Sequence, residues 1–347
     1  MTHRKPKSIL LALMLAATVT TLPAAAQQAP TDEMAAAAKA FLGGLAPRAG
    51  DAAFAFTDDE RFDWHYTPRR REGMKIGDMI QRQRNDAKTL MRSTLSARGI
   101  LKAEAIMALE AILAEIEGSS LSYRDPEKYF ISVFGTPGAY PWGWRLEGHH
   151  LSVNVTVAAK GEVSVTPTFL GTNPMRVPSG DHKGKLIQYD EFILALRLMR
   201  SMKPEQKDKV LIGERALGNI VTGPGRGDAL DKPEGLPVGE LDASQRLLLL
   251  QLINAYVGIA RNEIGTPYMK LVEDGFGDTR LAWAGPVSEV EPFYYRIHGP
   301  RILIEFDNTQ GGGNHVHSLW RDPLNDFGRD DLHRHYKDAP VTHGHRP

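Results

Sequence analysis

Residues 142–170 read WGWRLEGHHLSVNVTVAAKGEVSVTPTFL, and apolar and polar side chains alternate along most of this stretch. Successive side chains of a β-strand point to opposite faces, so a period of two predicts strands, whereas helices repeat every 3.6 residues. The pairs Glu147-Gly148 and Lys160-Gly161 interrupt the alternation, and two-residue loops that contain glycine join neighbouring antiparallel strands. Together with the FISVF run that precedes it, this stretch predicts an antiparallel meander.

Helical periodicity occupies the chain before the meander and returns after it. Ile106, Leu109, Leu113 and Ile116 recur at helical spacing, and Gly118 follows as a stop signal. Further helices are predicted at 32–43, between Ile76 and Leu95, at 184–200, and at 243–264 with Asp242 as its N-terminal cap.

A second block of strands follows in FYYRIHG and RILIEFD. Strands gathered into two blocks, with helices before and between them, are typical of α+β rather than alternating α/β proteins. We therefore expect an α+β fold in which antiparallel meander sheets follow an N-terminal helical block and further helices are inserted between the strand blocks. One domain is predicted at 27–338, mostly helical at 27–118 and a sheet with inserted helices at 129–338, before a flexible tail at 339–347. The Gly/Pro-rich loop at 223–239 fits a functional loop and a mobile loop equally well.

The first 26 residues have the pattern of a secretory signal peptide. Arg4, Lys5 and Lys7 precede an apolar run, and the small residues Ala24 and Ala26 stand where signal peptidase requires them. The run is shorter than the roughly 20 residues that span a bilayer, and no later stretch is long and apolar enough, so we expect no retained transmembrane segment. The sequence thus predicts a periplasmic or secreted protein.

Charge and cysteine content exclude several functional classes. The chain has 42 basic and 42 acidic residues, and removal of the three basic residues of the signal segment leaves 39 against 42. A nearly neutral protein lacks the basic surface that nucleic acids require, so no nucleic-acid partner is expected. The absence of cysteine excludes thiolate catalysis and cysteine-ligated metals.

Histidines occur in two places that one metal ion could bridge. In an extended segment His315 and His317 project to the same side, as two imidazoles must if they share an ion, although an isolated His-x-His is more often a hydrogen-bonded structural pair. The second place is His149-His150, where His150 heads the polar strand face that continues through Ser152, while His149 falls on the apolar face. We therefore predict His150, His315 and His317 as metal ligands, and His149 as the weaker candidate.

Carboxylates near these histidines complete the predicted site. In RILIEFD the alternation places Glu305 and Asp307 on the face opposite the core, so Glu305 is predicted as a further ligand and catalytic group, and Asp307 or Glu147 as general base. Two or three histidines with a carboxylate and an open position suit hydrolytic zinc or a mononuclear oxidase, while a hydrogen-bonded network without an ion fits the same residues. Arg321 could bind a substrate carboxylate or phosphate, although pairing with a nearby aspartate is more common.

These residues lead to three hypotheses for an unknown small-molecule or polymer substrate. The first is an exported metal-dependent hydrolase, with zinc preferred to copper or iron because the sequence places no Met or Tyr beside the histidines. The second is a copper- or iron-dependent oxidoreductase. The third is a non-enzymatic ligand-binding protein with a polar cleft lined by Trp142, Trp144, Trp320 and Arg321, since large rings with a few polar groups typify ligand pockets.

Several segments resemble one family of secreted bacterial and fungal proteins, domain-of-unknown-function family 3500. The segments are WHYTPRRREGMKIGDMIQRQRNDAKTLMRSTLS, WGWRLEGHHLSVNV, TPTFLGTNP and FDNTQGGGNHVHSLWRDPLNDFGRDDLHRHY. The resemblance covers nearly all of the chain after the signal segment. It implies no particular activity, but it implies that GHH and NHVHSLWRDP are signature positions of that family.

If the signal segment is cleaved, the mature chain should begin at or near Gln27. Mass spectrometry of periplasmic or secreted material checks this, and recovery of the chain with Met1 intact would show that the prediction is wrong.

Overall fold

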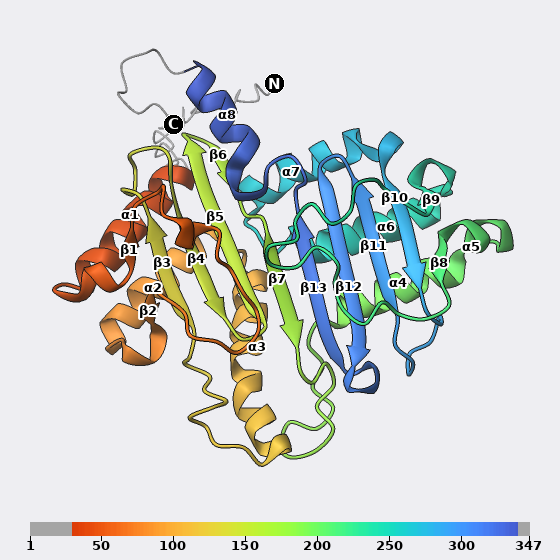
Figure 1. Ribbon diagram of the computed structural model, residues 1–347, viewed down its shortest axis with the longest axis horizontal. Helices are drawn as coiled ribbons and strands as arrows, with labels where there is room; N and C mark the ends of the chain where they lie inside the picture. The colour runs from red at the N-terminus through yellow and green to blue at the C-terminus, as the bar shows by residue number, and fades with distance from the viewer. Residues whose placement is uncertain (1–29, 339–347) are drawn as a thin grey trace, which may run out of the picture.

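Thirteen strands form one continuous sheet in the computed structural model, which describes residues 30–338 (Figure 1). The main path runs β1-β3-β4-β5-β7-β13-β12-β11-β10-β8, and β2, β6 and β9 pair with β3, β5 and β10. Only β1–β3 and β10–β8 are parallel pairs within this sheet. The strands are β1 (Ala53–Phe54), β2 (Met74–Lys75), β3 (Phe130–Phe134), β4 (Trp142–Gly148), β5 (Leu151–Ala159), β6 (Glu162–Ser164), β7 (Thr168–Thr172), β8 (Leu211–Gly213), β9 (Leu236–Pro237), β10 (Arg280–Ala284), β11 (Tyr294–Gly299), β12 (Ile302–Gln310) and β13 (His315–Arg321).

Eight α-helices accompany the sheet in the described part of the chain, and the predicted α+β class is confirmed. They are α1 (Pro30–Gly44), α2 (Gln81–Thr94), α3 (Ala97–Glu117), α4 (Tyr189–Ser201), α5 (Pro204–Val210), α6 (Ala243–Val257), α7 (Asn262–Asp274) and α8 (Arg329–Asp338). Gly118 ends α3 in the left-handed conformation, and Asp242 caps α6, both as predicted. The predicted signal peptide at 1–26 and tail at 339–347 lie outside the described residues.

Three predicted helices have clearly different bounds in the structure, and the one expected at 184–200 begins only at Tyr189. The helix expected at 243–264 is divided into α6 and α7, because the chain leaves the helical path after Gly258. The helix expected from Ile76 begins only at Gln81, since a short 3-10 turn at Ile76–Asp78 precedes extended backbone at Ile80. Among the described residues, no helix has the length and apolar character needed to cross a membrane.

The turn before β5 lies two residues later than predicted, at His149-His150. Glu147 and Gly148 are paired with β5 and belong to β4. Gly148 is required for a close approach rather than for a turn, because a Cβ there would lie 2.1 Å from the ring of Tyr129. The Lys160-Gly161 turn joins β5 and β6 as predicted.

The run EVSVTPTFL is also two strands rather than one. It divides into β6 and β7 because Pro167 has no N–H to donate to a strand ladder.

Alternation along the strands gives the sheet one apolar and one polar face. On β12, Ile302, Ile304 and Phe306 belong to the main hydrophobic core, whereas Glu305 and Asp307 point to the other side, as predicted. The core also contains buried residues of α1, α2, α3, α4 and α6, so these helices cover the apolar face. Glu305 and Asp307, together with His315 and His317 of β13, therefore lie on the face opposite these helices.

Trp142, Trp144 and Trp320 do not line a cleft, which corrects the prediction for them. Their exposed fractions are 0%, 0% and 1%, and all three belong to the main hydrophobic core on the helix-covered face. The alternation of β4 and β13 requires this placement, since each tryptophan occupies an apolar register position.

Two irregular segments bury the polar face: residues 55–73, here the first cover segment, and residues 214–235, the second cover segment. Figure 1 shows the second one crossing β13, β12 and β11 on the side away from α4 and α6. Both contribute to a small second hydrophobic cluster against the polar face, formed by Trp64, Tyr66, Phe169, Ile220 and Leu319. The polar face is therefore an interior, not a solvated surface.

Buried carboxylates hold both cover segments to the sheet. Glu147 accepts hydrogen bonds from Arg71 Nε at 2.6 Å and from the backbone N–H of His65 at 3.2 Å. Glu305, which is fully buried, accepts bonds from the N–H groups of Val221 at 2.6 Å and Thr222 at 2.8 Å. It also accepts bonds from the hydroxyls of Thr222 and Tyr294. These two carboxylates are thus structural anchors.

We expect Glu305→Gln to lower the free energy of unfolding by roughly 2 to 3 kcal/mol, because an amide N–H₂ would face donors that now bond to a buried carboxylate. Urea unfolding measures the loss, with Glu289→Gln as control because Glu289 forms a surface pair with Arg200. A loss no larger than that of the control would contradict the anchoring role of Glu305.

Candidate metal centre

His150 occupies the second position of the β4–β5 turn, in a conformation unusual for a residue with a side chain. Its φ is 60°, within the left-handed region that normally favours glycine. The N–H of His150 donates to the carbonyl of Tyr66 at 2.8 Å, and its carbonyl accepts from the N–H of Gly171 at 2.8 Å. The backbone N–H of His150 is therefore held by the first cover segment, and its backbone carbonyl is held by β7. Strained residues held in this way cluster at functional sites.

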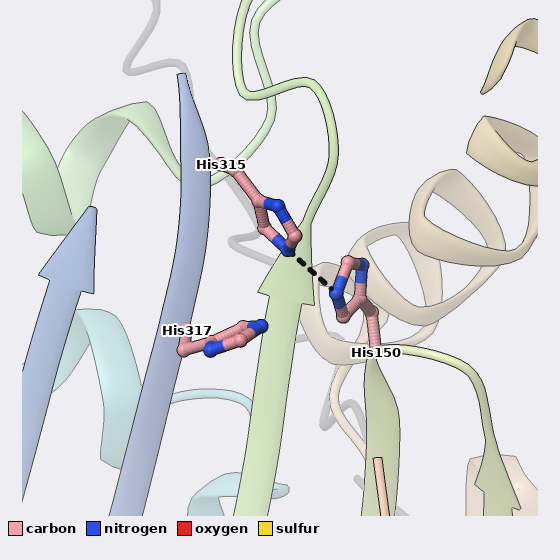
Figure 2. A group of neighbouring side chains, drawn as sticks. All are labelled: His150, His315 and His317. Carbon is pink, nitrogen blue, oxygen red and sulfur yellow. Dashed lines mark hydrogen bonds between the residues drawn. The ribbon is translucent and has the colours of Figure 1, made fainter. Parts of the chain in front are cut away.

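His315 and His317 face His150 across the intervening strand β7, as Figure 2 shows. Gly171 of β7 is paired with His317, so its missing side chain would project on the same face. A Cβ on Gly171 would lie 3.1 Å from Cδ2 of His150 and 2.9 Å from the carbonyl of Val316. Glycine at this position therefore leaves the room in which the ring from the β4–β5 turn meets the two rings from β13.

The three histidines form the group that could hold a metal ion in the described chain. One ligand nitrogen from each ring lies within 4.8 Å of the others, and Nε2 of His150 is 3.0 Å from Nε2 of His315 (Figure 2). Zinc–nitrogen bonds of about 2.0–2.1 Å at tetrahedral angles require nitrogen separations of roughly 3.3 Å. The 3.0 Å between the Nε2 atoms of His150 and His315 is close to that spacing.

Asn219 of the second cover segment determines which nitrogen of His317 is free. The backbone N–H of Ile220 donates to Oδ1 of Asn219 at 2.8 Å, which identifies that atom as an acceptor. Nδ1 of His317 lies 2.8 Å from the same oxygen and must therefore donate its proton. Nε2 of His317 consequently carries the lone pair, as in metal sites whose histidines are oriented by a second hydrogen bond.

Burial keeps all three imidazoles neutral. Desolvation is the largest cause in each case: it lowers the pKa of His315 to about 4 and of His317 to about 3, and holds that of His150 well below its usual range. Neighbouring histidines add to the effect by charge repulsion. Neutral imidazole is the form that binds metals, so no proton has to be displaced near neutral pH.

His149 lies behind the centre rather than in it. Its ring stacks on that of His150 with centroids 3.9 Å apart, and its Nδ1 is bonded to Glu110 of α3. The group of three ligands excludes it, so the structure gives His149 a supporting contact with His150 instead of the predicted ligand role.

The structure separates the predicted carboxylates by role. Oxygens of Glu305 and Glu147 are occupied by the anchoring bonds described above, and Arg145 also pairs with Glu147 at 3.1 Å, so neither is free as ligand or base. Asp307 is directly opposite His317 in the β12–β13 ladder, and its carboxylate accepts bonds from the N–H and hydroxyl of Thr309. Burial raises the pKa of Asp307. It is the predicted acid/base residue that remains beside the centre.

Arg321 lies at the opposite end of β13 from His315. Its Nε donates to Asp326 at 2.6 Å and its Nη1 to the carbonyl of Thr222 at 2.7 Å. The guanidinium is therefore engaged within the protein, which was the commoner alternative in the sequence analysis.

Sequence reasoning missed three residues that shape the centre: Tyr66, Gly171 and Asn219. Tyr66 packs its ring edge-on against His317, with centroids 4.9 Å apart, and stacks on Phe169. A glycine within the strand pattern TFLGT is itself a signal of close approach that could have identified Gly171. Asn219 has no such signal, because only the path of the second cover segment brings it to His317.

Acidification should destabilise the metal-free protein. The unfolded imidazoles titrate near about 6.5, and those of the folded protein titrate lower, so the unfolded state binds more protons between these values. Their contribution is complete above about pH 6.5 and is lost as the pH falls toward about 4. In chelator, the fall in Tm between about pH 7 and pH 5 should be smaller for the double variant His315→Ala/His317→Ala than for the wild type or for His182→Ala, which alters an exposed histidine. An equal fall in all three proteins would contradict this explanation.

Comparison with known proteins gives a family but no activity. The sequence model of the family described as "Protein of unknown function (DUF3500)" matches residues 27–329. No curated protein matches the chain. No solved structure matches it. The matched range contains all three histidines of the centre, and the chain belongs to the DUF3500 family.

Proposed function

We propose that this protein binds one transition-metal ion, preferably zinc, through His150, His315 and His317, and that it acts as a hydrolase. The observation that carries the proposal is the meeting of three neutral imidazoles, each with a nitrogen within 4.8 Å of the others. Three separate structural histidines would each be expected to bond to backbone or carboxylate groups. Here two ring nitrogens face each other at 3.0 Å instead.

The ligand set favours zinc with an open position. Three histidines with water in the fourth place form one of the known catalytic zinc arrangements. Because all three ligands are neutral, the full charge of the ion remains available to acidify that water. His315 is the least buried of the three and would face the entering molecule.

Asp307 is the group we propose as proton acceptor. It is opposite His317 in the strand ladder, while Glu147 and Glu305 are bound to the cover segments. Its raised pKa, caused mainly by burial, is the direction expected of a general base that works near neutral pH.

Tyr66 favours a second candidate function, a copper- or iron-dependent oxidoreductase. The preference for zinc rested partly on the absence of a tyrosine near the histidines in the sequence, yet the ring of Tyr66 contacts that of His317. Imidazole binds copper and iron as well as zinc. The identity of the ion bound by the purified protein therefore decides between the two proposals.

The proposed place of action is the periplasm or the outside of the cell. It rests on the signal-peptide pattern alone, since residues 1–29 lie outside the described part of the chain.

Purified untagged protein should contain about one metal ion per chain, and His315→Ala or His317→Ala should each remove most of it, because two histidines bind an ion far more weakly than three. Elemental analysis measures the content. Chelation should lower the Tm of the wild type but leave these variants almost unchanged. His182→Ala serves as control, and a wild type without metal, or variants that keep it, would refute the metal centre.

Hydrolysis is tested separately by Asp307→Asn. This variant should keep the metal and lose at least about tenfold of the activity against chromogenic esters or phosphoesters, as is typical for loss of a general base. An ion that proves to be copper, or a loaded wild type inactive on every such substrate, would reject the hydrolase proposal while leaving the metal centre intact.

A further inference from the structure

A pocket of 870 Å³ opens on the polar face at the end of β13 remote from the histidines. Its wall includes Leu303 and Arg321 of the sheet, Leu230 of the second cover segment and Tyr336 of α8. Arg321 stands four positions after His317 on β13, which corresponds to about 13 Å, and Leu319 of the second hydrophobic cluster lies between them. The pocket is thus distinct from the metal centre.

Arg61 of the first cover segment is a buried cation in this pocket wall without a counter-ion. Its exposed fraction is 7%, and no carboxylate of the described chain forms an ion pair with it. Its Nη1 donates to Thr156 Oγ1 at 3.3 Å and to the carbonyl of Phe327 at 3.1 Å, whereas its buried Nε has no hydrogen-bond partner among the described residues. Burial lowers the pKa of Arg61 to about 10, so the group stays charged at neutral pH.

Aromatic rings stabilise this guanidinium only in part. The rings of Phe56 and Phe62 lie 4.3 and 4.2 Å from its Cζ. A cation–π contact is weaker than the desolvation penalty of a buried charge. Neighbouring Arg321 shows the usual solution, since it pairs with Asp326 at 2.6 Å. Arg61 lacks an equivalent partner, and an anion that enters the pocket could supply it.

The backbone around the pocket is shaped for close approach. Phe327 has a φ of 56°, unusual for a residue with a side chain, and its ring contacts Phe62 edge-on with centroids 5.1 Å apart. Gly227 passes directly over Arg321, because a Cβ there would lie 2.4 Å from Nη2. Residues of the Gly/Pro-rich loop at 223–239 therefore form part of the pocket wall. Backbone strain like that at Phe327 is found most often at functional sites.

We propose that this pocket binds a small organic monocarboxylate with an aromatic or apolar body. The carboxylate would pair with Arg61, and the body would pack against Phe62, Phe327, Leu230 and Tyr336. A monoanion fits better than a phosphate dianion, because Arg61 is the one buried arginine of the wall that forms no ion pair with the described residues, and Asp228 and Asp231 add negative charge there. The volume lies within the range of about 300–1,000 Å³ that small-molecule sites occupy.

Benzoate is the probe for this proposal, with titration calorimetry of the full mature chain as the measurement. Binding should be saturable with one site, and Arg61→Met should weaken it at least tenfold. Arg82→Met, which alters an exposed arginine of α2, should leave it unchanged. His315→Ala should also leave it unchanged, which separates this site from the metal centre.

A second variant covers the case in which Arg61→Met fails to fold. Leu230→Trp fills the pocket from the second cover segment and leaves Arg61 in the sequence, and it should weaken benzoate binding at least tenfold in a folded protein. Absence of saturable benzoate binding by the wild type, or equal binding by both pocket variants, would overturn the proposal. Inorganic phosphate binding more tightly than benzoate in an Arg61-dependent manner would overturn the monocarboxylate assignment.

Discussion

Charged and polar groups on one face of the sheet are buried, and each of them needs a partner. The constraint arises because two cover segments close a face whose strand positions carry Arg145, Glu147, Glu305 and Asp307. Removing a charge from water costs several kcal/mol unless a partner replaces the solvent. Most groups here have such partners: Glu147 bonds to Arg71 and Arg145, and Glu305 accepts from four donors. These bonds hold the two cover segments in place. The cover segments in turn keep the polar face of the sheet out of water.

Two departures from that pattern on this face carry the functional proposals. At one end, the rings of His150 and His315 direct nitrogens at each other, while His317 has its Nδ1–H fixed by Asn219. With the protons of His150 and His315 on their Nδ1 atoms, all three Nε2 lone pairs would be available to one ion. At the other end, Arg61 is buried without a carboxylate. Groups left without partners in an otherwise well-bonded interior are those that an external molecule can satisfy.

Local pattern was sufficient for the parts of the site that lie on regular strands. The two-residue period placed His315 and His317 on one side and put Glu305 and Asp307 opposite the core, because strand geometry imposes that alternation wherever the strand goes. It did not reveal that Trp142, Trp144 and Trp320 fill the core, since burial depends on the helices packed against that face. Nor could it show that Glu305 is saturated by Val221 and Thr222, or that Asn219 orients His317. Those contacts are made by an irregular segment about 90 residues away in the chain, whose path no periodicity encodes.

The central claim is that His150, His315 and His317 bind one ion together, and the coordination shell of that ion tests it most directly. X-ray absorption spectroscopy at the edge of the metal in the purified protein counts the ligands and measures their distances. Three imidazole nitrogens at about 2.0–2.1 Å with one further light atom are expected. A shell dominated by carboxylate oxygens, or one with fewer than three imidazoles, would contradict it.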